Sequence, residues 1–301
     1  MLQSANMRGA LFMVLAMAGY VFNDVFMKSL AQDMSMGQAI FLRGIVASTL
    51  IFIIAWRSGA LRPAAIMFKP MVLLRTASES IATVLFLTAL AEIQLANASA
   101  ILQALPLAIT AGATLFLREP VGWRRWSATL IGFAGVLIII RPGLAGYDSY
   151  SLLVVGAVIF AAMRDLSTRA MDDNVPSLFL SVLVAPAVAV TGLVMWIADG
   201  TVAPIDVNHG FKIISAAIFI LIGYQFIVLA TRDGEMSFIV PFRYTSLLWS
   251  ILLGALFFAE FPDYLTVIGS VIIVMTGLYT LYRERRVTNR DKDGTRSFET
   301  T

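Results

Sequence analysis

Long apolar segments alternate with short polar connections along most of the 301-residue chain. A helix needs about 20 consecutive apolar residues to cross a hydrocarbon layer about 30 Å thick. Windows of this length lie at about residues 8–31, 35–56, 70–91, 95–117, 122–141, 148–170, 176–197, 210–231, 236–258 and 262–283. No alternating pattern of about ten residues repeats, so the sequence does not favour a transmembrane β-barrel. We predict an all-α membrane protein with ten transmembrane helices.

Composition supports this prediction and narrows the chemistry. Hydrophobic residues make up 59% of the chain and charged residues only 14%, whereas soluble domains carry about 25% charged residues. The chain has no cysteine and one histidine, His209, which excludes disulfides and the usual cysteine or two-histidine metal motifs. We therefore expect no metal and no cofactor. The net charge of +3 is more typical of basic cytoplasmic loops than of a nucleic-acid surface in a chain this apolar.

The distribution of Lys and Arg predicts the orientation. With a cytoplasmic N-terminus, fifteen of these residues fall on the cytoplasmic side, three on the other side and four inside spans. Because cytoplasmic loops are enriched in Lys and Arg, both termini are predicted to lie in the cytoplasm of a bacterial inner-membrane protein. This requires an even number of spans. The apolar run after Arg8 continues without a small-residue cleavage site, so we interpret it as the first span rather than a signal peptide.

The two halves of the chain resemble each other at an offset of 141 residues. This offset aligns Asp24 with Asp165, Lys28 with Arg169, Gly59 with Gly200 and Glu119 with Glu260. One inserted residue then aligns Pro120 with Pro262 and Gly135 with Gly277. Polar and helix-breaking residues rarely match at one offset by chance in apolar sequences, so we interpret the match as an internal repeat.

Each half holds five predicted spans, an odd number, so the second half would enter the membrane with the opposite orientation. Such inverted repeats build many secondary transporters, with the substrate bound where the halves meet. We predict two five-helix inverted-topology repeats around a central cavity, at residues 1–143 and 144–283. The polar, mixed-charge segment 284–301 is predicted to be a disordered cytoplasmic tail.

Short motifs punctuate both halves. The first half contains Ala89-Leu-Ala-Glu92, Ala96-Asn-Ala-Ser99, Pro106, Leu117-Arg-Glu119-Pro120, Trp123-Arg-Arg-Trp126, Ile131-Gly132-Phe-Ala-Gly135 and Arg141-Pro142-Gly143. The second half contains the looser set Pro241-Phe-Arg-Tyr244, Phe258-Ala-Glu260, Ile268-Gly269 and Gly277. Together these motifs resemble the EamA domain, which defines the ten-helix branch of the drug/metabolite transporter superfamily. The resemblance implies a carrier, since members export amino acids, metabolites or toxic cations, or import metabolites such as S-adenosylmethionine. Within the superfamily, the chain most resembles bacterial exporters of aromatic amino acids.

Ionisable side chains inside spans are candidates for function, because a charge in the bilayer is costly unless it faces a partner or a cavity. Arg75 and Glu79 lie four residues apart on one face of the third span, close enough to pair. One interpretation is a buried ion pair that fixes helix packing. The other is that Glu79 binds a substrate ammonium group.

Arg164 and Asp165 are adjacent, so their side chains should point about 100° apart and each should need another partner. Asp24, the repeat mate of Asp165, lies at the opposite end of the membrane. The two aspartates could form alternating gates that close with Lys28 and Arg169 in turn. The alternative is that all four side chains snorkel towards the interface.

Arg243 lies two residues after Pro241, and a proline in a span bends the helix and often marks a binding region. Pro106 in the fourth span is comparable, with a simple packing kink as the alternative for both prolines. Since a guanidinium can bind a carboxylate with two hydrogen bonds, we expect Arg243 or Arg75 to bind a substrate carboxylate. The predicted substrate-binding residues are Arg75, Glu79, Gln103, Gln225, Arg243 and Tyr244, and the predicted gating or hinge residues are Asp24, Asp165, Arg164, Pro106 and Pro241.

The remaining signals favour a carrier over other classes. No HExxH, GxSG or paired GxGD motif occurs, so we expect neither an enzyme nor a catalytic residue. A channel is less favoured because the repeat is internal and inverted. A zwitterionic amino acid accounts for buried charges of both signs, so we predict a secondary transporter that exports amino acids, aromatic or other, by alternating access. Metabolite import and cationic-drug export stay as alternatives.

The sequence defines the driving force, the partners and the oligomeric state less closely. No buried acid stands alone in a manner that demands proton coupling, so uniport and antiport both stay open. The predicted partners are a small-molecule substrate and the lipid bilayer, without nucleic acid. The glycines Gly132, Gly135 and Gly269 permit close helix packing and could serve a dimer face or an internal scaffold, so both a monomer and a homodimer are possible.

Overall fold

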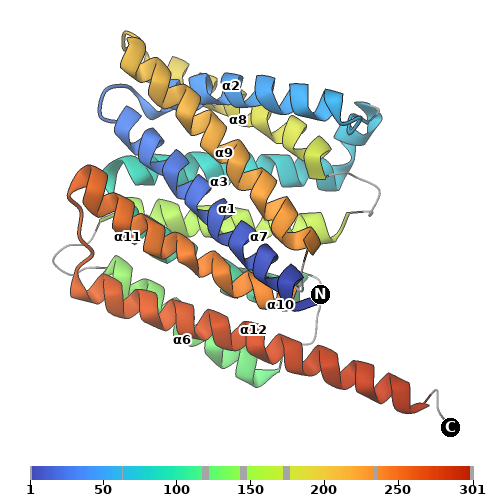
Figure 1. Ribbon diagram of the computed structural model, residues 1–301. Coiled ribbons are helices and arrows are strands. Elements are labelled where there is room, and N and C mark those ends of the chain that lie inside the picture. The colour runs from blue at the N-terminus through green and yellow to red at the C-terminus, as the bar shows by residue number, and fades with distance from the viewer. Residues whose placement is uncertain are drawn as a thin grey trace.

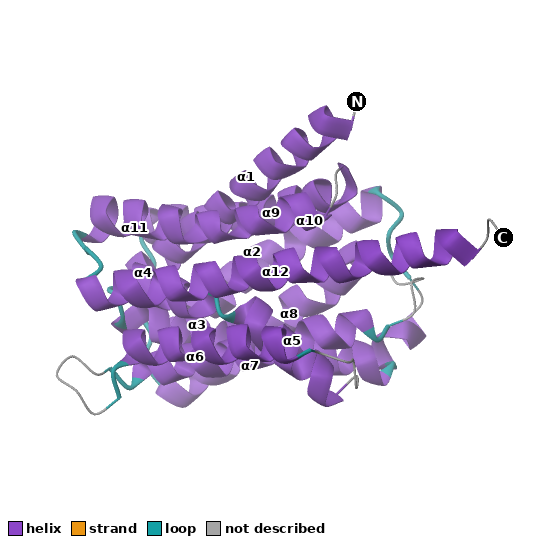
Figure 2. Cartoon of the chain, turned by 90° about the horizontal axis from the view of Figure 1, so that it is seen from below, coloured by secondary structure: helices purple, strands orange, loops and turns teal. Residues whose placement is uncertain are grey.

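Every regular element that the computed structural model describes is helical (Figures 1 and 2), within residues 2–62, 64–116, 122–142, 148–171, 177–233 and 236–298. The first half contains α1 (Leu2–Leu30), α2 (Met36–Arg57), the 3₁₀ helix η1 (Ala64–Phe68), α3 (Pro70–Glu92), α4 (Leu95–Leu102), α5 (Leu105–Phe116) and α6 (Trp123–Ile140). The second half contains α7 (Tyr150–Arg169), α8 (Ser177–Asp199), α9 (Val207–Asp233), α10 (Met236–Ile239), the 3₁₀ helix η2 (Val240–Tyr244), α11 (Thr245–Phe258) and α12 (Tyr264–Phe298). The predicted all-α class is confirmed for these residues.

Each of the ten apolar windows holds helical structure. Eight segments are long and apolar enough to cross a membrane, and the other two windows hold the shorter apolar helices Trp126–Ile140 and Tyr264–Thr280. The chain is therefore a multi-pass helical membrane protein, while ten crossings stay a prediction. In Figure 1, α1 begins and α12 ends at the same end of the bundle. We call this the terminal end, and the opposite one the far end.

Two windows are interrupted where the sequence places its prolines. The fourth window divides into α4 and α5, with the break just before Pro106. The ninth passes from α10 through η2, which contains Pro241, into α11. Proline lacks the amide hydrogen of a regular helix turn and clashes with the preceding turn, which accounts for both breaks. Pro186, by contrast, lies within the continuous helix α8.

Helices from the two halves pack against each other in pairs: α1 with α9, α2 with α8, α3 with α7, and α6 with α12. Glycines permit the closest approaches. A Cβ atom on Gly19 of α1 would lie 2.9 Å from the backbone nitrogen of Gly223 on α9, and one on Gly135 of α6 would lie 3.0 Å from the carbonyl oxygen of Gly269 on α12. The glycines predicted to serve either a scaffold or a dimer face therefore serve packing within the chain.

Some sequence predictions fall at the edges of the described structure. Glu119, Pro120 and the proposed boundary at residues 143 and 144 lie outside the described residues. The segment predicted to be disordered begins at residue 284, yet the backbone of α12 is helical through Phe298. That segment contains no proline that would end the helix.

Candidate functional site

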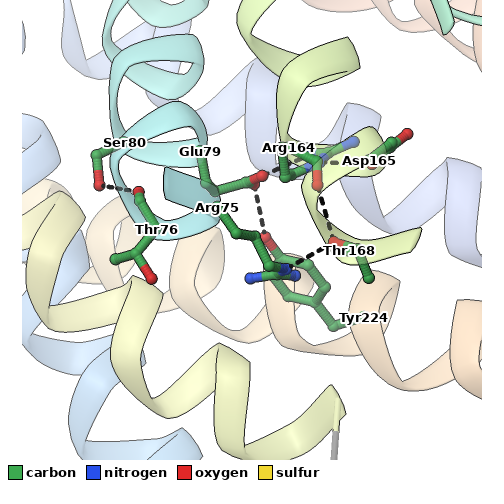
Figure 3. A network of polar contacts seen from close by, with 8 residues as sticks. All are labelled: Arg75, Thr76, Glu79, Ser80, Arg164, Asp165, Thr168 and Tyr224. Atoms are coloured by element: carbon green, nitrogen blue, oxygen red, sulfur yellow. Dashed lines mark hydrogen bonds and ion pairs between the residues drawn. The ribbon is translucent and has the colours of Figure 1, made fainter. Parts of the chain in front are cut away.

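A polar network joins the two halves inside the apolar bundle (Figure 3). Glu79 on α3 is only 8% exposed. Its Oε2 accepts a hydrogen bond at 2.7 Å from Nη1 of Arg164 on α7, and its Oε1 accepts one at 3.2 Å from the hydroxyl of Tyr224 on α9. The carboxylate is therefore held between two helices of the other half, and each of its oxygens has a donor. We call Glu79, Arg164, Tyr224 and the contacting residues Arg75, Asp165 and Thr168 the Glu79 network.

Arg75 lies one helical turn before Glu79 but has a different partner. Its Nε donates to Oγ1 of Thr168 at 3.1 Å. Its Nη1 is buried and has no hydrogen-bond partner within the described residues. The predicted pairing of Arg75 with Glu79 is therefore wrong: the ion pair of Glu79 is with Arg164. Spacing along one helix allowed the first pair, but packing of α3 against α7 brings a competing guanidinium to the carboxylate.

The expectation for Arg164 and Asp165 is also wrong. Although the two residues are adjacent, Nε of Arg164 donates to Oδ1 of Asp165 at 2.7 Å. The arginine side chain is long enough to bend around the helix, so the 100° between neighbouring Cα–Cβ directions does not keep the charged ends apart. Arg164 thus binds two carboxylates at once, one from its own helix and one from α3.

A second polar chain runs from α1 to α2. The amide of Asn23 donates to Oδ1 of Asp24 at 2.9 Å, and the Asn23 oxygen accepts from Nη1 of Arg43 at 2.9 Å. Asn23 and Arg43 are 2% and 6% exposed, and Nε of Arg43 has no hydrogen-bond partner within the described residues. A neutral amide therefore separates the Asp24 carboxylate from the guanidinium.

Lys28 lies near the far end and pairs with Glu260 instead of Asp24. Its ammonium group lies 2.9 Å from Oε1 of Glu260 and donates to the carbonyl oxygens of Leu90 and Ile93 at 3.2 and 2.5 Å. The other oxygen of Glu260 accepts from the backbone nitrogen of Leu95 at 2.8 Å. Lys28 is 6% exposed, so it does not snorkel. The side chain of Arg169, its expected counterpart, lies outside the described residues.

Two more charged contacts lie in the links at the far end. The Arg141 guanidinium, through its hydrogen bond, lowers the pKa of the Asp263 carboxyl group to about 2. A hydrogen bond from Lys212 lowers the pKa of Asp33, and His209 contributes in the same direction. Both acids are about half exposed, so solvent screens these pairs.

The two broken windows meet through short polar side chains. Nε2 of Gln103 donates to the Ser246 hydroxyl at 2.7 Å, and the hydroxyls of Ser99 and Ser250 share a hydrogen bond. The hydroxyl of Tyr244, which aligns with Gln103 at the 141-residue offset, is buried without a hydrogen-bond partner within the described residues.

Arg243 is half-buried on η2, beside the second break. Within the described residues, no acidic side chain forms an ion pair with it. It acts electrostatically on Tyr20, whose ring packs edge-on against Tyr224 with centroids 5.7 Å apart. Arg243 therefore lies near the Glu79 network and still has donors available.

The structure brings together some of the predicted residues but not all. Arg75, Glu79, Arg164 and Asp165 lie in one network, whereas Gln225 is exposed on α9 and takes no part in it. The network residues Tyr224 and Thr168 were not among the predicted site residues. Asn23 could have been proposed from its position beside Asp24. No group of His, Asp or Glu among the described residues could hold a metal ion.

Comparison with known proteins identifies transporters. Residues 7–141 match the EamA-like transporter family. The pseudopaline exporter of Pseudomonas aeruginosa is 26% identical over 274 residues, covering 89% of this chain and 93% of the exporter. The S-adenosylmethionine uptake transporter of Rickettsia prowazekii is 25% identical over 287 residues, covering 93% and 94%. The riboflavin transporter of Vibrio cholerae is 30% identical over 198 residues, covering 64% and 65%. One crystal structure shares the fold at a TM-score of 0.61 and 15% identity, covering 95% of this chain and 99% of the other.

Proposed function

We propose that the chain, whose residues 7–141 match the EamA-like transporter family, is a secondary transporter that exports amino acids across a bacterial inner membrane. The choice of substrate rests on one observation: two arginines have guanidinium donors that no carboxylate among the described residues binds. Arg243 has no carboxylate partner within the described residues, and Arg75 has a buried Nη1 without a partner. Guanidinium groups of this kind are suited to a substrate carboxylate.

The proposed binding site includes Arg243, Arg75, Gln103 and Tyr244. Arg243 provides the main carboxylate contact, and the unpaired Tyr244 hydroxyl lies one residue away. Glu79 has a structural role in this site, because both of its oxygens already have donors. The substrate ammonium group would then bind Asp165 rather than Glu79, because Arg164 bonds only Oδ1 of Asp165 and its Oδ2 has no partner among the described residues.

Alternating access is proposed from the arrangement of the halves. An inverted repeat requires that each contact between spans have a counterpart with the halves exchanged. The packing of α1 on α9 has its counterpart in α3 on α7, and α2 on α8 and α6 on α12 each pair a helix with its own repeat mate. These contacts support a two-fold repeat of five spans in each half. The inverted orientation is proposed from the odd number of spans per half, and the cytoplasmic position of the terminal end from the distribution of Lys and Arg.

The alternatives within the fold differ in which charges they use. A cationic-drug exporter would need an acid free of cationic partners: Glu79 is bound to Arg164, so this alternative would use Asp24, whose donor is a neutral amide, and would leave Arg75 and Arg243 without a role. Metabolite import differs only in direction. The relatives are named for pseudopaline, S-adenosylmethionine and riboflavin, so the family alone does not select the substrate. A channel would show conductance that does not saturate with substrate concentration.

Counterflow in proteoliposomes tests this proposal. Vesicles loaded with one unlabelled amino acid should take up its labelled form faster than empty vesicles, with saturation, for at least one of the twenty amino acids. Arg243→Ala removes a hydrogen bond to a charged group, worth about 1.5–3 kcal/mol, which is roughly a tenfold to hundredfold loss of apparent affinity.

Arg57→Ala is the matched control, because Arg57 is exposed at the end of α2, and its uptake should equal that of the wild type. Unchanged apparent affinity in Arg243→Ala would remove this residue from the site. Failure of all twenty amino acids to exchange would reject amino-acid export.

A further inference from the structure

Asp24 is a membrane-embedded carboxylate whose side chain has one hydrogen bond, from the neutral amide of Asn23. Spacing along α1 offers Lys28, one turn away, as its natural partner. In the structure, however, Lys28 is bound to Glu260 and two backbone carbonyl groups. Spacing along the sequence therefore suggests a counter-ion for Asp24, but no cationic side chain among the described residues pairs with it directly.

The helices packed against α1 supply one charge that acts on Asp24. That charge is Arg43 on α2, which is held one amide away. On α3, Glu79 is bound to Arg164, and on α9, Tyr224 donates to Glu79. On η2, Arg243 acts on Tyr20. The segments α10 and α11 contain no ionisable residue.

The hydrogen-bonded series Asp24–Asn23–Arg43 is sensitive to the charge on Asp24. With Asp24 ionised, Asn23 connects a negative and a positive group, and Nε of the buried Arg43 still has no partner. With Asp24 neutral, the positive charge of Arg43 loses its negative counterpart. Burial disfavours a carboxylate supported only by a neutral amide, and intramembrane carboxylates of this kind commonly serve in proton relays.

We propose that Asp24 is a proton-binding site that couples transport to the transmembrane proton gradient, with Asn23 and Arg43 as its positioning residues. A hydronium ion transfers one proton to a carboxylate oxygen of Asp24, which forms the O–H bond and releases water, and the reverse step returns the proton on the other side. This coupling rests on the proposed transporter function.

The proton site is tested first without any substrate. Infrared spectra of the purified full-length protein should contain a protonated-carboxyl band that disappears as the pH is raised. The band should be absent in Asp24→Asn and present in Asp199→Asn, a control at an exposed aspartate at the end of α8. If Asp24→Asn does not fold, Asn23→Leu should move the midpoint of the titration. A wild-type protein without a titrating band, or a band that persists in Asp24→Asn, would overturn the proposal.

Coupling is then tested in proteoliposomes with labelled L-phenylalanine, or with another amino acid that exchanges in the counterflow screen. A gradient of about one pH unit should drive up to about tenfold accumulation or depletion of label if one proton moves per substrate. Asp24→Asn should lose this response and Asp199→Asn should retain it. Exchange that ignores the gradient in the wild type would overturn coupling while amino-acid transport stands. If no amino acid exchanges, amino-acid export fails and the infrared titration decides the proton site.

Discussion

Glu79 connects helices of the two halves because each of its carboxylate oxygens has its own donor. Arg164 and Tyr224 supply these donors from α7 and α9. A buried charge is tolerated when it is both paired and hydrogen-bonded, and Glu79 meets both conditions. We therefore assign it a structural role, which leaves Arg75 and Arg243 as the predicted carboxylate-binding residues with unused donors near the network.

Lys28 and Lys212 form a natural comparison at the far end, because each pairs with an acid in a different environment. The side chains of Lys28 and Glu260 are 7% and 18% exposed, whereas Asp33, the partner of Lys212, is 44% exposed. Removing one member of a buried pair leaves an uncompensated charge and costs about 3–5 kcal/mol. An exposed pair contributes about 0–1 kcal/mol.

We accordingly expect Lys28→Met to lower the free energy of unfolding by about 3 kcal/mol, and Lys212→Met to lower it by less than about 1 kcal/mol. Denaturant titration in detergent measures both changes. The double variant Lys28→Met/Glu260→Gln should regain part of the loss, because it removes both buried charges. If the two single lysine variants lowered the free energy of unfolding equally, the buried pair of Lys28 and Glu260 would not stabilise the far end more than the exposed pair does.

Residue-level partners were only partly predictable from the sequence. The sequence identified Arg75, Glu79, Arg164 and Asp165 as unusual because they are charged in apolar spans. It paired Arg75 with Glu79 wrongly, because spacing along one helix says nothing of the side chains that a neighbouring helix brings. Tyr224 could not be predicted for the same reason. Aromatic residues are common in spans, and only the structure shows that the Tyr224 hydroxyl donates to the Glu79 carboxylate.

The two broken windows are the elements most suited to movement. Both breaks lie at prolines, and Gln103 and Tyr244, which align at the 141-residue offset, lie directly beside them. Pro186 offers a matched control, since α8 is continuous around it and its side chain is exposed. Pro106→Ala or Pro241→Ala would restore an amide hydrogen and favour a continuous helix.

We predict that Pro106→Ala and Pro241→Ala each slow counterflow by at least about tenfold, which corresponds to about 1.4 kcal/mol in the transport barrier. Thermal stability should be equal or higher, because a helix turn is gained. Pro186→Ala should leave counterflow unchanged. Full activity in both variants at the breaks would mean that these prolines serve packing alone.

At the level of elements, hydropathy predicted the helices well and their interruptions in part. Each window became helical because spanning segments must satisfy their backbone hydrogen bonds internally. The prolines indicated bends at Pro106 and Pro241. Periodicity could not show that Pro106 separates two helices while Pro186 lies within one, because that difference depends on the packing of neighbouring helices.

The whole molecule is organised by contacts between its halves. Each main helix pair unites a helix from the first half with one from the second. The sequence offset of 141 residues suggested a relation between the halves, but it could not specify which helices touch. The structure shows these contacts. Two of the helix pairs cross at glycines, where Gly19 meets Gly223 and Gly135 meets Gly269.

The orientation of the halves yields the most direct test of the repeat. Gly59 and Gly200 align at the 141-residue offset and follow α2 and α8, and both adopt left-handed backbone angles, with φ of 64° and 65°. If the repeat is inverted, the two positions lie on opposite sides of the membrane. Since the chain has no cysteine, one cysteine can be introduced beside each glycine, as Ser58→Cys and Thr201→Cys, without removing others.

Both introduced positions are exposed. In intact spheroplasts, a membrane-impermeant maleimide should label Thr201→Cys and should leave Ser58→Cys unmodified until the membrane is permeabilised. Labelling of both positions from the same side would refute the inverted topology. It would also remove the basis for alternating access by exchange of the halves, because two parallel halves could not convert an inward-open state into an outward-open one by exchanging their conformations.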